Sequence, residues 1–507
     1  AVQLSMMGAY ICAGKVLAPA IPLYDLAAAI SLVMFASSIP VSLAGWGVRE
    51  MSAVAALGAV GMQAAPAVAI AVLIGTLSIA LAGILALSSA RAATHAVNAP
   101  PKPADRSSHQ EILAKMLPVF VAILIFFQIL VPTGSTTLNA NLADPIAILC
   151  GIVFLLAHAR GAPVWRVSGI NLHAMACTIS ISLALLIGAA AIGWTQWAVT
   201  NKYLGWLVLL CYGAAGAMAT KFDFSKILST FIVAGSAICI LEIARAVLAG
   251  LGFAQPSFVA GLSNNPNAFA FQCVMLLAAS LAHRRQSIVA IALALIGVWL
   301  SSSRAGICTA VVVMIISAVM IDQSWRKIAP VLFAASTVAI ALLLLPKITG
   351  VETTLSNPVA ALTVGSASST AEHLKSMADG FAMFLAHPFF GAGLGTFIAT
   401  WDGPYPLVIH STLIWFLAEF GLIGALIFVS PIVRIFIIEA RRFRNNDAAG
   451  NLLILMIAGF SAMSIFHELM YQRTLWFLLG MALAHTASSK ISNKRQTAAQ
   501  PSQFEIA

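Results

Sequence analysis

His410 and Arg304 stand at the ends of apolar runs, where charged and titratable residues are unusual, and they could do acid–base and phosphate chemistry there. His410 directly precedes a long apolar run. A neutral imidazole near pH 7 accepts a proton from an attacking hydroxyl, although a lone histidine at a helix start is more often structural. Arg304 follows three serines between two apolar runs. Its planar guanidinium fits phosphate oxygens, but it can also snorkel beside those hydroxyls.

Two further segments offer polar groups close to apolar runs. Glu419 lies nine residues after His410 inside an apolar stretch, where it either orients that histidine or is a buried, hydrogen-bonded acid. The stretch Asn264-Asn265-Pro266-Asn267 precedes another apolar run. Ser263 or Asn264 would cap a helix with Pro266 in its first turn. The free amides of such a helix start also suit a diphosphate, and the asparagines are candidates for glycan or acceptor contacts.

Three other groups have more ordinary explanations beside the functional ones. The glycine-rich stretch 387–397 lacks the Lys-Ser/Thr of a nucleotide-binding loop, so we expect tight turns or packing there. Arg245 and Glu242 are close enough to pair with each other. Polar side chains also gather in the short segment before the last apolar run, and they are His467, Glu468, Tyr471 and Arg473.

The elements that position these residues are membrane helices. The 507-residue chain is 61% hydrophobic and 9% charged, whereas soluble proteins carry roughly 25% charged residues. Apolar runs of about 17 to 25 residues recur throughout, and each is long enough to cross the hydrocarbon core as a helix. We therefore predict an all-α integral membrane protein, since helices satisfy their own backbone hydrogen bonds in lipid.

The chain divides into four parts by composition. Residues 1–90 hold about three to four transmembrane segments, and a polar, proline-rich, basic stretch at 91–115 is a cytoplasmic linker. Residues 116–487 hold about twelve spans and a single long loop, 347–410. Residues 488–507 form a polar tail that we expect to be disordered. The twelve spans lie near 116–132, 144–160, 174–193, 204–220, 227–250, 266–283, 286–303, 305–321, 328–346, 411–433, 448–466 and 473–487.

The net charge of +10 points to membrane orientation and not to nucleic acid, because the basic residues sit in short loops between apolar runs. With the linker in the cytoplasm, most basic residues fall on the cytoplasmic side. Lys15 and Arg49 belong to the first part and are left out of this comparison. In the rest of the chain, the basic residues on the opposite side are Lys202, Arg245, Arg304, Lys347, Lys375 and Arg473. Topology disfavours these six, so each needs a structural or functional reason.

Cofactor chemistry has little support in the sequence. The seven cysteines form no CxxC pair, so we expect free, buried thiols with neither disulfides nor zinc. The carboxylates on the outer side, which are Asp144, Glu352, Glu372, Asp379 and Asp402, are scattered. We therefore expect metal-independent chemistry without a cofactor, in which arginine and not a cation faces phosphate.

Taken in order, several of these segments resemble the O-antigen ligase/polymerase superfamily. They are the Asn264–Asn267 stretch, Ser303-Arg304-Ala305-Gly306, the His387-Pro388 and Gly391–Gly395 segment, and His410 with Glu419–Gly424. The resemblance covers about 115–490. It implies a GT-C-like membrane fold in the bacterial inner membrane, with the active side and the long loop facing the periplasm.

The resemblance also implies a reaction and roles for residues. The enzyme would transfer a glycan from an undecaprenyl-diphosphate carrier to a hydroxyl of lipid A-core or of a growing polysaccharide. His410 would activate the acceptor and Arg304 would bind the diphosphate. The family usually has a further arginine in the long loop, but Ser368–Lys375 contains none. Lys375, Arg473 and Arg245 are the candidates to replace it.

The first part of the chain resembles a different family. Ile39–Glu50 is similar to the signature of the lysylphosphatidylglycerol synthase transmembrane (flippase-like) family, of which residues 1–90 would be a partial module. There Arg49 and Glu50 either pair with each other or contact a lipid head group. This module leaves open a transporter or flippase of lipid-linked saccharide or phospholipid as an alternative to a glycan transferase. The missing loop arginine leaves open an inactive membrane scaffold.

Overall fold

The structure is a computed structural model that falls into two units. It describes residues 2–38, 48–64, 66–72, 74–75, 116–133, 136–159, 170–219, 223–251, 253, 259–283, 287–320, 367–403, 407–442 and 448–499. The first unit comprises residues 1–110 with 132–137, and the second comprises residues 111–131 and 138–507. The expected linker at 91–115, most of the flippase-like signature (39–47), the predicted span at 328–346 and the start of the long loop (347–366) lie outside the described residues.

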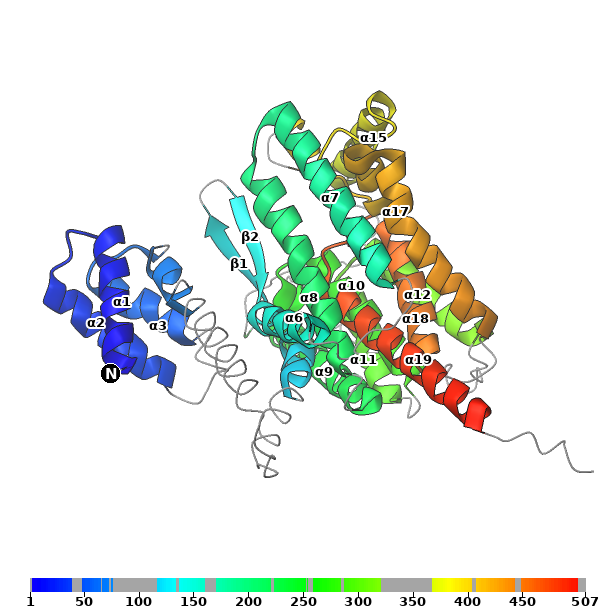
Figure 1. The fold of residues 1–507 in the computed structure, drawn as a ribbon, viewed down its shortest axis with the longest axis horizontal. Coiled ribbons are helices and arrows are strands. Elements are labelled where there is room, and N and C mark those ends of the chain that lie inside the picture. Colours follow the sequence, from blue (N-terminus) through cyan, green and yellow to red (C-terminus); the bar gives the residue numbers. More distant parts are fainter. Residues whose placement is uncertain are drawn as a thin grey trace, which may run out of the picture. The chain divides into compact units, whose positions relative to one another are not determined.

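The first unit is a small helical cluster (Figure 1). Its described helices are α1 (Val2–Leu17), α2 (Leu23–Ser38) and α3 (Val48–Ala59). They pack through apolar side chains such as Leu26, Val33 and Leu57, all fully buried. Arg49 forms a 2.9 Å ion pair with Glu50, which is the structural role that the sequence allowed for these two residues.

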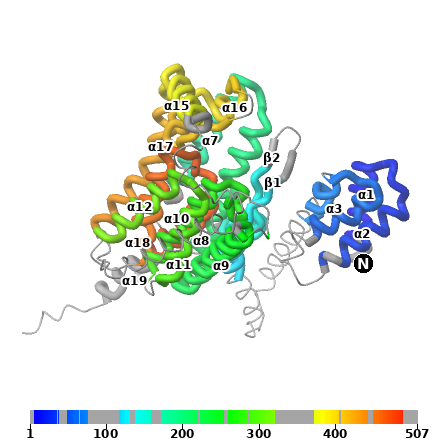
Figure 2. Tube along the Cα trace, turned by 180° about the vertical axis from the view of Figure 1, so that it is seen from behind, coloured from blue at the N-terminus to red at the C-terminus, as the bar shows by residue number. Residues whose placement is uncertain are grey.

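The second unit is a bundle of apolar helices built around α10 and α18 (Figures 1 and 2). Helix α10 is buried along nearly its whole length and packs against α9, α11, α12 and α18. The described elements are β1 (Gln128–Thr133) and β2 (Thr136–Asn141), apart from their residues in 132–137, which belong to the first unit, and then α6 (Asp144–Ala159), α7 (Ile170–Ile192), η2 (Trp197–Leu204), α8 (Gly205–Ala219), α9 (Phe224–Gly250), η3 (Gly261–Ser263), α10 (Pro266–Ala282), α11 (Ile288–Leu300), α12 (Arg304–Met320), α15 (Ala367–Ala386), α16 (Thr396–Thr400), α17 (Thr412–Arg442), α18 (Ala448–Ser464) and α19 (Arg473–Ala499).

These helices follow most of the predicted spans, and the protein is mostly helical. Among the described residues, four helical segments are long and apolar enough to cross a membrane, namely Leu172–Ile192, Trp197–Ala219, Phe224–Ala249 and Thr412–Arg441. Other apolar helices, including α6, α10, α11, α12 and α18, are shorter. The number of spans therefore stays a prediction.

Two boundaries differ from the prediction. The proposed span at 116–132 is helical only over 116–124 and then enters strand β1, which pairs with β2. The isoleucine, valine and threonines of this segment favour strand over helix. Disorder throughout the tail is also wrong. Helix α19 continues to Ala499, because residues 490–499 are rich in lysine, arginine, glutamine and alanine, which favour helix.

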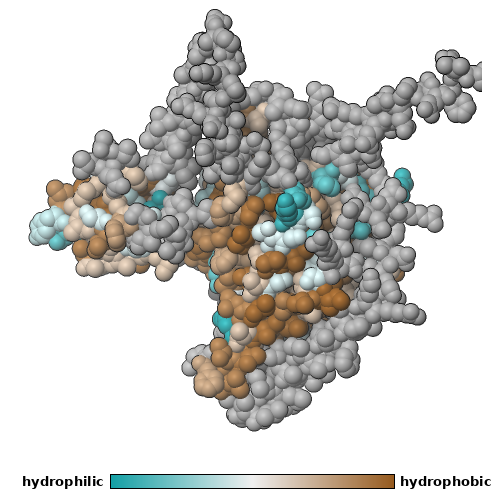
Figure 3. Space-filling model, turned by 90° about the horizontal axis from the view of Figure 1, so that it is seen from below, coloured by the Kyte–Doolittle hydropathy of each residue, from teal (hydrophilic) through white to brown (hydrophobic). Residues whose placement is uncertain are grey.

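The outer surface of the second unit is strongly apolar. Large hydrophobic side chains such as Leu186, Val233, Val319 and Leu426 are more than half exposed. Figure 3 shows hydrophobic side chains covering much of one described face. Such a surface is stable in lipid but would drive aggregation in water, so the protein is membrane-embedded.

Candidate active site

Three histidines from separate segments meet beside α15, a helix at one end of the bundle (Figures 1 and 2). His373 lies on α15, His410 lies two residues before the start of α17, and His467 lies between α18 and α19. The His373 and His410 rings are stacked with centroids 3.6 Å apart. The His467 ring stands edge-on, 5.8 Å from His373 and 6.5 Å from His410. The single predicted base is therefore one of three imidazoles.

Two hydroxyl side chains, those of Ser376 and Thr412, hold the segment that carries His410. The Oγ of Ser376 lies 3.1 Å from His410 Nδ1 and accepts a hydrogen bond from the His410 backbone N–H at 3.3 Å. Two residues further on, Thr412 Oγ1 donates to the His467 carbonyl at 2.8 Å and accepts from the Leu469 N–H at 3.0 Å. These hydrogen bonds around the start of α17 therefore fix the positions of His410 and His467 relative to each other.

All three imidazoles are neutral at pH 7. Burial, followed by His373, lowers the pKa of His410 to about 4, against the raising effects of Glu372 and the Val408 carbonyl. Burial and the two other histidines lower the pKa of His467 to about 3. Burial and the nearby Arg304 charge lower the pKa of His373. A neutral imidazole can accept a proton, so these three histidines can act as bases and contribute no positive charge.

Arg304 lies next to this cluster, because its charge acts on His373. It is the first residue of α12 and is exposed. Ser303, directly before it, accepts a hydrogen bond from the Gly306 N–H at 3.2 Å and so caps the helix. The structure therefore links Arg304 to the cluster through His373, on which its charge acts and whose ring stacks on that of His410.

The stretch Asn264–Asn267 caps helix α10 and is hydrogen-bonded to Ser303, the residue before Arg304. The helix cap of α10 is Asn265, whose Oδ1 accepts from the N–H groups of Asn267 and Ala268 at 2.9 and 3.1 Å. The prediction of Ser263 or Asn264 as cap was wrong, because Asn264 adopts a left-handed φ of 56° and donates to the Gln128 carbonyl. Asn267 Oδ1 accepts a 2.7 Å hydrogen bond from Ser303.

Glu419 holds the glycine-rich segment and not His410. Its buried carboxylate accepts hydrogen bonds from Trp415 Nε1 at 2.7 Å and from the Phe397 N–H at 3.3 Å. The Gly393 N–H donates to the Glu419 carbonyl. Gly391, Gly393 and Gly395 all have positive φ and pack too closely for a side chain. These bonds match the ordinary alternative for Glu419 and the expected packing role of the glycines.

The other basic candidates each contact a neighbouring side chain. Arg473 forms a two-pronged ion pair with Asp144, at 2.6 and 2.8 Å. Arg245 pairs with Glu242 at 2.8 Å. Lys375 lies 4.9 Å from the centre of the Trp401 ring. Each arrangement explains why a basic residue occurs there without a bound phosphate.

A buried ion pair was not foreseen from the sequence. Lys202 Nζ lies 2.6 Å from the carboxylate of Glu468, the neighbour of His467. The ammonium also sits 4.6 Å from the ring centres of Trp415 and Tyr471, where aromatic faces attract a cation. Lys202 lies on the π-helix η2, a rare form that is frequent at functional sites. Sequence spacing gives no sign of this pair, because 266 residues separate its members.

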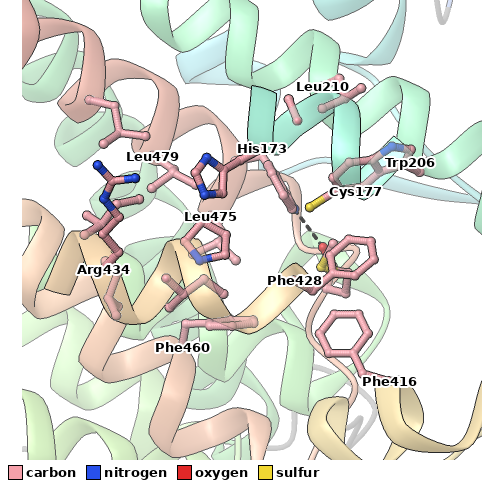
Figure 4. Close-up of a pocket in the computed structure, with 18 of the residues that line it drawn as sticks. His173, Cys177, Trp206, Leu210, Phe416, Phe428, Arg434, Phe460, Leu475 and Leu479 are labelled. Atoms are coloured by element: carbon pink, nitrogen blue, oxygen red, sulfur yellow. Dashed lines mark hydrogen bonds between the residues drawn. The ribbon is translucent and has the colours of Figure 1, made fainter. Parts of the chain in front are cut away.

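An apolar cavity of about 360 Å³ opens between α7, α8, α17, α18 and α19. Figure 4 shows Arg434 on the opposite side of the cavity from Trp206 and Phe416. Phe416 is six residues after His410, and the lining residue Met470 is three residues after His467. One end of the cavity therefore lies within about two helical turns of the histidines.

Comparison with known proteins gives one family. No curated protein sequence matches the chain. A model of the O-Antigen ligase family matches residues 289–429, a range that contains Arg304, His373, Ser376 and His410. The match supports the O-antigen ligase superfamily for this part of the chain, and with it a glycosyltransferase- or ligase-type enzyme acting on lipid-linked glycan.

Proposed function

We propose that this protein transfers a glycan from an undecaprenyl-diphosphate carrier to an acceptor hydroxyl, on lipid A-core or on a growing polysaccharide. The observation that carries the proposal is that the half-buried, neutral His410 imidazole stacks on His373, on which the Arg304 charge acts. His410 supplies a base and Arg304 a fixed positive charge. Both are needed when a hydroxyl displaces a diphosphate.

The proposed reaction is a single inverting displacement. His410 takes the proton from the acceptor hydroxyl while that oxygen forms a bond to the anomeric carbon of the donor sugar. The bond from the anomeric carbon to the diphosphate oxygen breaks, and its electron pair leaves with the carrier. Arg304 stabilises the negative charge that develops on the diphosphate. No other group is consumed, since the imidazolium then loses its proton to solvent.

The donor's lipid needs an apolar space that reaches the histidines. The cavity beside α17 has apolar walls and begins within two helical turns of His410. We assign it to part of the isoprenoid chain, with the diphosphate at the histidine end. Positive charge in the predicted cytoplasmic loops supports an inner-membrane protein whose histidine end faces the periplasm. The arginine beside the site supports metal-independent transfer, for which activity should persist in a chelator.

Deletion of the gene followed by complementation tests this function. Loss of long glycan from core lipid would identify a ligase, and unchained repeat units would identify a polymerase. His410→Ala should fail to restore the glycan, while His387→Ala, in the glycine-rich segment, should restore it. Full restoration by His410→Ala at wild-type protein levels would reject this function for the site.

A further inference from the structure

We propose that Ser376 is a positioning residue that fixes His410 as the tautomer with its proton on Nδ1, which leaves the Nε2 lone pair to take the acceptor's proton. The inference deepens the proposed function and rests on it for the role of His410 as base. The assignment of the tautomer itself rests only on the hydrogen bonds of one hydroxyl group.

The Ser376 hydroxyl has three neighbours within hydrogen-bond distance. Its oxygen lies 2.9 Å from the His373 carbonyl, 3.3 Å from the His410 backbone nitrogen and 3.1 Å from His410 Nδ1. A serine hydroxyl can donate one hydrogen bond and accept two. The three contacts therefore fill its capacity.

Counting protons assigns the direction of each bond. A carbonyl can only accept, so the single hydroxyl proton goes to His373. A backbone N–H can only donate, so it takes one lone pair of Oγ. The remaining lone pair faces His410 Nδ1, which must then carry a proton. With the other tautomer, Ser376 would donate its single proton to Nδ1, its 2.9 Å contact with the His373 carbonyl would no longer be a hydrogen bond, and that carbonyl would keep only the bond within α15.

Burial favours this assignment. The Ser376 side chain is 0% exposed, so water does not replace a lost contact, and the tautomer with the proton on Nδ1 keeps one hydrogen bond more, worth about 1 kcal/mol. Ser376 also follows His373 by three residues on α15. The helix that supplies the stacked ring therefore supplies the group that orients its partner.

The groups around His410 do not offer a competing role for Nδ1. His373 contacts the face of the ring, and His467 meets it edge-on. Arg304 and Glu372 act electrostatically on the pair. The Val408 carbonyl raises the pKa of His410 through a hydrogen bond from the ring, and the proposed tautomer requires that Nδ1, and not Nε2, donates this bond. A base oriented by a third group is the usual arrangement for activating a hydroxyl, and here a neutral hydroxyl takes the place of a carboxylate.

Solid-state NMR of the full-length protein with ¹⁵N-labelled histidine tests the tautomer directly, with the His410 signals assigned by their loss in His410→Gln. We expect the Nδ1–H form in the wild type and a shift towards Nε2–H in Ser376→Ala. A wild-type spectrum with the proton on Nε2 would overturn the inference. Because this readout needs no substrate, it separates the tautomer from the proposed function. The Nδ1–H form together with full activity of His410→Ala would reject the function alone.

Kinetics test the consequence for catalysis. Ser376→Ala should lower kcat by at least about tenfold, a modest share of a general base's contribution, with the donor KM unchanged. Ser376→Thr keeps the hydroxyl and should recover most of the rate. Thr400→Ala removes a hydroxyl that bonds only carbonyls of its own helix and should leave kcat unchanged. Wild-type kcat in Ser376→Ala, or no recovery in a folded Ser376→Thr, would contradict the positioning role.

Discussion

Ser303 Oγ donates a 2.7 Å hydrogen bond to Asn267 Oδ1 and so joins the start of α12 to the start of α10. Both side chains lie at helix N-termini, and Ser303 directly precedes Arg304. Two polar segments that are 36 residues apart in the sequence therefore act as one unit. The asparagine stretch contributes to the candidate site through Arg304, whose helix it anchors.

This bond predicts coupling between Asn267 and Ser303. Asn267→Ala and Ser303→Ala should each raise the donor KM, and the double variant should do so less than additively, with a coupling energy of about 1 kcal/mol for one hydrogen bond. Ser287→Ala is the control, because Ser287 caps a different helix, α11; its effect should add to that of Ser303→Ala. Fully additive effects of Asn267→Ala and Ser303→Ala would show that the bond does not position Arg304.

Arg304 and Arg473 should respond differently to lysine. Arg304 is exposed at the histidine cluster, so Arg304→Lys should keep the Tm and raise the donor KM about tenfold through loss of the planar fork. Arg473 is bonded to Asp144 by two nitrogens, so Arg473→Lys should lower the Tm and keep the donor KM. A raised KM at an unchanged Tm in Arg473→Lys would return this arginine to the donor site.

The pH dependence of kcat/KM should reflect the low pKa of His410. A base works in its unprotonated form, and the pKa of about 4 keeps His410 unprotonated down to that pH in the free enzyme. The acid limb of kcat/KM should therefore lie near pH 4, below the usual histidine value of about 6.5. A limb near pH 6.5 that disappears in His410→Ala would contradict the burial of this ring.

Stability should fall with acid over a defined range. The pKa values of His410 and His467 are lowered on folding, so between about pH 6.5 and pH 4 the unfolded chain binds protons that the folded chain does not. The contribution is complete above about pH 6.5 and is lost as the pH falls towards the folded values. His467→Phe removes one titrating ring, and its Tm should decline less than that of the wild type between pH 7 and pH 4.5.

The sequence predicts well those features that depend on local pattern. Apolar runs set the position of α7, α9, α10 and α18, and the isolated position of Arg304 marked it as unusual. His373 and Ser376 were not predicted as site residues, although Lys375, which lies between them, was considered as a positive charge for the donor. Their importance comes from the packing of α15 against the start of α17, and no periodicity within α15 reveals which residue its face will meet.

Selecting basic residues because the membrane topology disfavours their position identified Arg304, but it also identified residues with structural partners. Arg473 and Arg245 were selected by the same argument as Arg304, yet each has a carboxylate partner. Asp144 pairs with Arg473 across 329 residues, a separation that spacing cannot resolve. Glu242 is only three residues from Arg245, so that pair was foreseen. Charge position thus identifies residues that need a partner, and only the fold shows whether the partner is a side chain or leaves room for a ligand.

The Lys202–Glu468 pair should stabilise the loop that carries His467. Their side chains are 5% and 10% exposed, so removing one leaves the other charge buried, at a cost of about 3–5 kcal/mol. Lys202→Met and Glu468→Leu should each lower the Tm strongly, and the double variant should recover most of the loss because no charge is then stranded. Lys226→Ala, in the exposed pair with Asp223, is the control and should change the Tm little. The double variant should still lose transfer activity if the pair sets the position of His467, whereas a fully active double variant would limit the pair to stability.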